Sequence, residues 1–200
     1  MSNQLDLLSI FKAVSGTLSD NQSALNEADS YNGDHGDNMV NIFNLVTGAM
    51  SDKKDADTSE QLAYASKLLS KEKSGSAQAY AKGLSSAAEQ FQGQNITADG
   101  VMPLLQSLFS AGETPSEPAS PLQGLLGGLL GGGDDDGLDA GDLLNAGMSF
   151  FSAKSSGKSS QEALIEAVIS GSPMGKSPHR AQSSQMVAST VLEMLGQLGK

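Results

Sequence analysis

The residues best suited to metal and phosphate chemistry lie in a short polar segment near the N-terminus. Residues 29–38 combine carboxylate, amide and imidazole side chains with two glycines; the polar members are Asp29, Asn32, Asp34, His35, Asp37 and Asn38. Hard cations such as Mg²⁺ bind oxygen ligands, and glycine lets backbone N–H groups approach phosphate oxygens. An apolar helical pattern starts at Met39, so a helix N-terminus, which favours anions, is expected behind the loop. The segment therefore predicts a site for a metal–nucleotide complex.

The residue types of this segment also fit two other kinds of loop. Asp, Asn and Gly are also ordinary turn and helix-cap residues, and this alternative stays open. An EF-hand loop needs a glutamate at its twelfth position. Counting from Asp29, that position is Val40, so the sequence disfavours an EF-hand.

The order of these residues resembles a known signature. Gly33 to Met39 matches the second half of the N-terminal signature of the DhaL-type nucleotide-binding domain, and Leu25, Asn26 and Asp29 match the first half. That domain occurs in dihydroxyacetone kinases, as the L subunit or a C-terminal domain, and in fatty-acid kinases. The loop is shorter than the dihydroxyacetone-kinase form, and Asn32 stands where a metal-binding aspartate is expected. An amide oxygen can bind a cation but brings no charge.

The resemblance implies roles for residues from three segments. It implies Asp29, Asn32 and Asp34 as Mg²⁺ ligands, with Asp37 as a further ligand. It also implies that three loops contact ADP or ATP. The first loop would contribute His35, Gly36, Asn38 and Met39, and a second Ser/Gly loop would contribute Ser74, Gly75 and Ser76. A late basic loop would contribute Lys176 and Arg180. The match is weaker in the late loop, and an Asp-Lys-Thr segment of the family has no counterpart after Gly157. No catalytic residue is assigned.

The elements that position these loops are predicted to be helices. Apolar residues recur at helical spacing in eight segments: 5–18, 37–50, 62–69, 77–91, 101–109, 140–153, 163–169 and 186–198. Thr97 is expected to cap the fifth of them, and 170–180 is expected to be a loop. Val/Ile/Thr alternation is scarce, so no strand is predicted. We therefore expect an all-α fold of about eight antiparallel helices, which the resemblance implies form a barrel-like bundle with the three loops at one end.

Residues 112–137 interrupt the helical pattern. They are rich in Pro and Gly and end in a run of aspartates. We interpret them as a low-complexity insertion in a single domain that spans 1–200.

Composition narrows the classes of partner. The chain has 200 residues, a net charge of −11 and no cysteine. The acidic charge disfavours nucleic acid or an anionic membrane as the main partner. No signal peptide and no apolar stretch of about eighteen residues or more is found, so we expect a cytoplasmic protein without a membrane span.

The functional hypothesis is a nucleotide-binding component of a kinase. In the resembled family a separate domain or subunit binds the acceptor, a ketose or a fatty acid, so an acceptor-binding partner is implied; a homo-oligomer is also compatible with the sequence. The alternative is a non-catalytic DhaL-like binding or regulatory protein, which Asn32 and the missing Asp-Lys-Thr segment favour. A secreted helical interaction protein without a nucleotide is a third hypothesis.

Overall fold

The described part of the chain is built from α-helices. The computed structural model describes residues 6–110, 157 and 160–198. Within these ranges there are eight α-helices, two short 3₁₀ helices and no strand, which confirms the all-α prediction. The elements are α1 (Leu7–Asp20), α2 (Gln22–Ala28), α3 (His35–Asp52), α4 (Thr58–Leu69), α5 (Gly75–Gln90), η1 (Ala98–Gly100), α6 (Val101–Phe109), α9 (Ser160–Ser170), η2 (Pro173–Lys176) and α10 (Pro178–Leu198).

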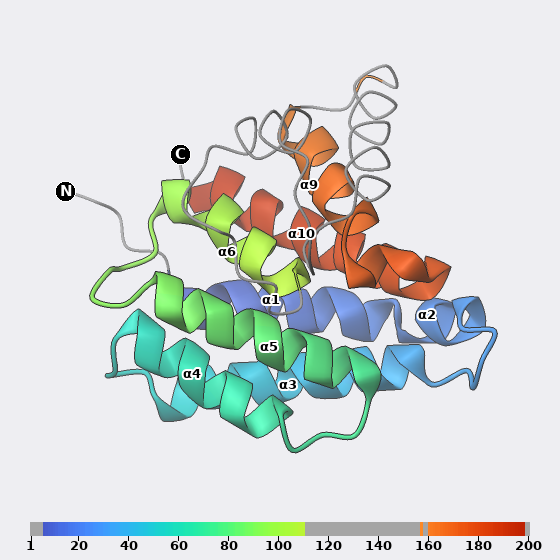
Figure 1. Cartoon of the computed structure of the whole chain (residues 1–200), viewed down its shortest axis with the longest axis horizontal. Helices are drawn as coiled ribbons and strands as arrows, with labels where there is room; N and C mark the ends of the chain where they lie inside the picture. The colour runs from blue at the N-terminus through green and yellow to red at the C-terminus, as the bar shows by residue number, and fades with distance from the viewer. Residues whose placement is uncertain (1–5, 111–156, 158–159, 199–200) are drawn as a thin grey trace, which may run out of the picture.

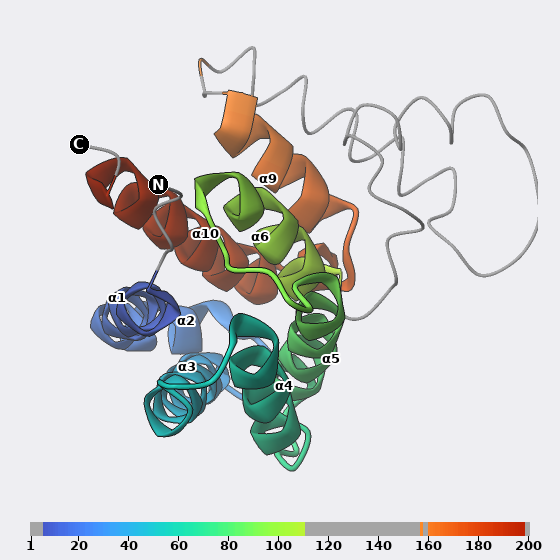
Figure 2. The ribbon, with the colours of Figure 1, turned by 90° about the vertical axis from the view of Figure 1, so that its left-hand side faces the viewer.

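The helices pack against one another in a continuous series (Figure 1). Helix α1 packs on α3, α3 on α4, α4 on α5 and α5 on α6; α6 and α10 both contact α9, and α10 returns to α1. Figure 2 shows α1 and α3 nearly end-on, with the other helices beside them around a shared interior. The barrel-like arrangement stays a prediction. No described helix is both long and apolar enough to cross a membrane.

An aromatic cluster joins three of these helices in the core. The ring of Phe43 on α3 lies 6.1 Å from that of Phe11 on α1 and 5.2 Å from that of Tyr80 on α5. All three side chains are almost completely buried. Burial of a large apolar side chain contributes about 1.5–3 kcal/mol, so this cluster fixes the positions of α1, α3 and α5 relative to one another.

Small residues set how closely the helices approach. A Cβ atom at Gly83 of α5 would lie 2.6 Å from the carbonyl oxygen of Leu108 on α6. Real Cβ contacts are not this short, so glycine is required for the observed α5–α6 packing. At this position a glycine has a packing role.

The structure corrects three local expectations. Helix α2 was not predicted, because its seven residues are too few for a clear periodicity. Helix α10 starts at Pro178, well before the predicted residue 186, since proline is tolerated at the first helical position. Thr97 precedes η1 and makes no side-chain cap hydrogen bond. The insertion 112–137 and the predicted helix 140–153 lie outside the described residues.

Candidate functional site

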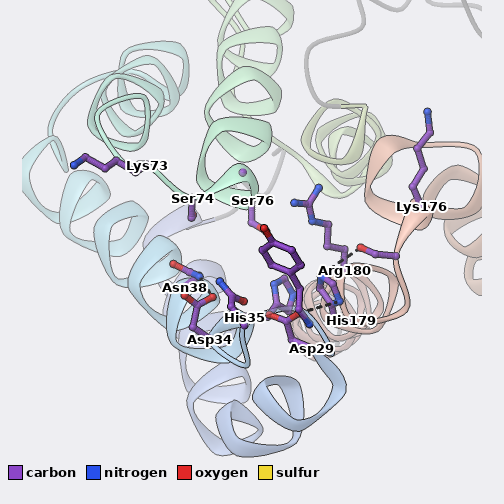
Figure 3. A pocket seen from close by; sticks show the side chains of 14 residues that line it. Asp29, Asp34, His35, Asn38, Lys73, Ser74, Ser76, Lys176, His179 and Arg180 are labelled. Atoms are coloured by element: carbon purple, nitrogen blue, oxygen red, sulfur yellow. Dashed lines mark hydrogen bonds and ion pairs between the residues drawn. The ribbon is translucent and has the colours of Figure 1, made fainter.

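A cavity of about 660 Å³ lies where three helices begin. The first turns of α3, α5 and α10 meet there, at the right-hand end of the molecule in Figure 1. Figure 3 shows the lining side chains, which come from segments far apart in the sequence. They are Asp29, Tyr31, Asn32, Asp34, His35, Asn38, Lys73, Ser74, Gly75, Ser76, Lys176, Ser177, His179 and Arg180.

Most of the residues predicted for the site line this cavity. They are Asp29, Asn32, Asp34, His35, Asn38, Ser74, Gly75, Ser76, Lys176 and Arg180. Gly36, Asp37 and Met39 do not line it. The sequence analysis did not assign four lining residues, Tyr31, Lys73, Ser177 and His179, to the site. The structure thus brings together the three predicted segments, whereas three residues of the first segment face elsewhere.

The residues that face elsewhere hold the loop in place. The N–H of Gly36 donates to Asn26 Oδ1 at 2.6 Å, and a Cβ at Gly36 would lie 2.1 Å from the carbonyl oxygen of Gln22. Gly36 therefore lets α3 start directly against α2. Met39 is fully buried in the core. The turn before α3 uses Gly33 at φ +69°, a conformation that side chains rarely adopt.

Three of the predicted metal ligands, Asp29, Asn32 and Asp34, line the cavity, whereas Asp37 does not. Asp29 accepts the N–H of Tyr31 at 3.0 Å. Asp34 accepts an N–H of the Asn38 amide at 2.6 Å, and the exposed Asp37 accepts one from Gln22.

Each of these carboxylates therefore already has a protein donor. Across the described ranges, no group of three or more His, Asp or Glu side chains could hold a metal ion. The residues present do not fit a ready-made Mg²⁺ cage.

Two histidines lie in contact at the cavity. The chain contains two histidines, and their rings, His35 and His179, are 4.6 Å apart in an edge-to-face arrangement. His35 Nε2 lies 2.9 Å from Ser183 Oγ. His179 Nδ1 lies 3.7 Å from Asp29 Oδ1, and His179 Nε2 lies 3.4 Å from Ser177 Oγ (Figure 3). No local signal predicts this pair, because the two residues are distant in sequence.

The surroundings set the charge of these groups. Burial lowers the pKa of His35 to about 4, and the neighbouring His179 contributes in the same direction. His35 is therefore neutral near pH 7. The N–H of Tyr31 holds the pKa of Asp29 below its ordinary value, against the opposing effect of burial. Asp29 is therefore ionised at neutral pH.

The positive side of the cavity is centred on Arg180, the one arginine in the sequence. A Cβ at Gly75 would lie 2.9 Å from Arg180 Nη2, so the guanidinium lies against the N-terminus of α5. Across the described ranges Arg180 has no ion-pair partner. Lys73 and Lys176 are exposed, and in Figure 3 they extend away from the imidazoles.

The Ser74 hydroxyl has a structural role. Its Oγ accepts the N–H of Ala77 at 3.1 Å and caps α5. This side chain is therefore a helix cap as well as part of the cavity wall. Ser76, two residues further along the chain, also lines the cavity and is buried.

Comparison of the chain with protein-family models, with curated proteins and with solved structures found no match. The DhaL resemblance therefore rests on the sequence segments quoted above.

Proposed function

We propose that this cavity binds the phosphates of ADP or ATP, and that the chain is the nucleotide-binding component of a kinase of the dihydroxyacetone/glycerone or fatty-acid type. The observation that carries the proposal is the position of Arg180 against the start of α5, in a cavity lined by the first turns of three helices.

The electrostatics of this position favour an anion. Each helix N-terminus carries a partial positive charge of roughly half an elementary unit. A guanidinium beside such an end is repelled unless an anion lies between them. The rest of the chain is strongly acidic, with a net charge of −11. Positive potential collected at one point of an acidic protein supports specific recognition of phosphate.

The size and the rim of the cavity agree with a nucleotide. A volume of about 660 Å³ lies within the range of small-molecule sites, roughly 300–1,000 Å³. Tyr31 lines the cavity, and its side chain is 92% exposed. An exposed aromatic ring beside a phosphate site offers a stacking surface for a base.

The kinase hypothesis includes Mg²⁺ and a partner, both from the resemblance. Asp29 and Asp34 line the cavity, but their oxygens accept protein hydrogen bonds, and Asn32 brings no charge. We therefore assign no step to the metal. An acceptor-binding subunit of the ketose- or fatty-acid-binding type would present the molecule to be phosphorylated.

A second candidate is a non-catalytic DhaL-like binding or regulatory protein. The observation that favours it is that, among the described residues, no group of three or more His, Asp or Glu side chains could hold a metal ion, since phosphoryl transfer depends on charge neutralisation around the transferred group. Turnover with an acceptor-binding subunit distinguishes the two candidates, because only the kinase component supports phosphorylation of the acceptor.

Calorimetry with ADP and ATP, with and without Mg²⁺, tests the proposal. Arg180→Gln should weaken binding by about 10-fold to 100-fold, as expected for the loss of a hydrogen bond to a charged group. The matched control is Lys82→Gln, which removes the same charge from an exposed position on α5 outside the cavity. Equal affinities of the two variants, or no binding by the wild type, would contradict the proposal.

A further inference from the structure

Three side chains at the cavity form a chain of contacts that the proposed nucleotide site does not need. Asp29 approaches one nitrogen of the His179 ring, Nδ1, at 3.7 Å. The other nitrogen, Nε2, lies 3.4 Å from the hydroxyl of Ser177. All three residues line the cavity, and the carboxylate of Asp29 is 5% exposed. The order carboxylate, imidazole and hydroxyl is that of an activated nucleophile with its base and the group that orients the base.

The use of both ring nitrogens gives His179 a defined role. A carboxylate next to Nδ1 favours the tautomer with the proton on that nitrogen and leaves Nε2 as an acceptor. Nε2 then faces the Ser177 hydroxyl and can take its proton. The 3.4 Å contact of Nε2 with Ser177 is a long hydrogen bond, and the 3.7 Å contact of Nδ1 with Asp29 is an ion-pair distance beyond hydrogen-bond range. Catalytic contacts are often this long before a substrate is bound and shorten in the complex.

A second His–Ser contact in the same region lacks these properties. His35 Nε2 lies 2.9 Å from Ser183 Oγ, but Ser183 is fully buried and does not line the cavity. Its hydroxyl donates to the carbonyl oxygen of Arg180 at 3.0 Å. Ser183 is therefore a structural contact, and Ser177 is the hydroxyl that a ligand in the cavity can reach.

The neighbours of Ser177 indicate what it would attack. Lys176 precedes it in sequence, Arg180 lies in the first turn of the helix that follows, and both line the cavity. Cationic groups and a helix N-terminus stabilise the charge on a transferred phosphoryl group.

We propose that Ser177 accepts a phosphoryl group from a bound nucleoside triphosphate, with His179 as the base and Asp29 as the positioning residue. Ser177 Oγ attacks the γ-phosphorus. The Oγ–P bond forms as the bond from this phosphorus to the β,γ-bridging oxygen breaks, and the nucleoside diphosphate leaves with that electron pair. The hydroxyl proton passes to His179 Nε2. This inference rests on the proposed function, because the nucleotide site supplies the donor.

Incubation of the full chain with ATP and Mg²⁺, followed by intact-mass measurement and peptide mapping, tests the inference. We expect one phosphoryl group on Ser177. Ser177→Ala should abolish the modification, whereas the control Ser183→Ala should retain it. His179→Ala should slow the modification at least about 100-fold, as for loss of a general base. Added imidazole should restore part of the rate, which a purely structural role of His179 would not allow.

Asp29 acts through His179, so its variants need a separate readout. Asp29→Asn should slow phosphorylation, Asp29→Glu should restore part of the rate, and ATP affinity should be measured in parallel for each. ATP binding by the wild type without phosphorylation, phosphate on another residue, or full activity of His179→Ala would overturn this inference and leave the proposed function intact. Absence of ATP binding in calorimetry would overturn both.

Discussion

His35 Nε2 lies 2.9 Å from Ser183 Oγ, a buried contact between residues 148 positions apart in the sequence. It joins the first residue of α3 to α10, and the His35 ring packs edge-to-face on that of His179. One part of the wall of the candidate site is therefore formed by the packing of α3 against α10, and the start of α5 supplies another part. Conditions that weaken this contact should affect both stability and ligand binding.

Stability should fall as the pH is lowered from about 6.5 to about 4. The pKa of His35 is lowered from 6.5 to about 4 in the folded chain, so in this window the unfolded state binds a proton that the folded state does not. Binding of more protons by the unfolded state makes stability rise with pH. The lowered pKa of His35 corresponds to a change in the free energy of unfolding of roughly 3 kcal/mol across this window. Urea unfolding at several pH values in this window measures how the free energy of unfolding changes with pH. His35→Gln should make this free energy depend less on pH. If the variant keeps the slope of the wild type, groups other than His35 cause the pH dependence.

Gly36→Ala should destabilise the fold and separate α2 from α3. The new Cβ would lie 2.1 Å from the carbonyl oxygen of Gln22, a backbone atom that cannot move away alone. Forced overpacking of this kind costs about 1–3 kcal/mol or more. Gly48→Ala on the same helix is the matched control, because a Cβ there meets nothing within 4 Å. It should stabilise by roughly 0.5–1 kcal/mol through helix propensity. Thermal unfolding of both variants should therefore shift in opposite directions.

Tyr31→Ala should weaken nucleotide binding without changing stability. The side chain is 92% exposed, so its removal leaves the core intact. A stacking contact with a base is worth about 1–3 kcal/mol. Tyr31→Phe should retain this affinity because the ring is kept. Calorimetry with ATP and with inorganic triphosphate separates recognition of the base from recognition of the phosphates. If Tyr31→Ala loses the same affinity for both ligands, Tyr31 does not contact the base.

Asn32→Asp should raise affinity for the nucleotide in the presence of Mg²⁺. It supplies a charged oxygen at a cavity position where the resembled family carries a metal-binding aspartate. The expected gain is on the order of a kcal/mol or two, as for a charge-assisted contact. Ser30→Asp adds the same charge to an exposed residue of the loop that does not line the cavity. A response of equal size in this control would mean that net charge alone accounts for the gain.

The sequence by itself determined the all-α class and the positions of most of the described helices, and it named ten of the fourteen residues that line the cavity. The apolar spacing in 101–109 predicted α6 with the limits that the structure shows, because a buried helix face leaves a local signal. The signature around Gly33 predicted a turn that leads into a helix. The start of α10 was predicted less well, since its first turns carry few apolar residues.

Only the tertiary structure decided which side chains share the cavity. The contacts of His179 with His35 and Asp29 and the approach of Arg180 to Gly75 join segments that are distant in the chain. Such contacts depend on how whole helices pack, and no spacing within a segment records them. The same packing turned Gly36 toward α2 and away from the cavity, because close contact between helices requires the residue without a side chain.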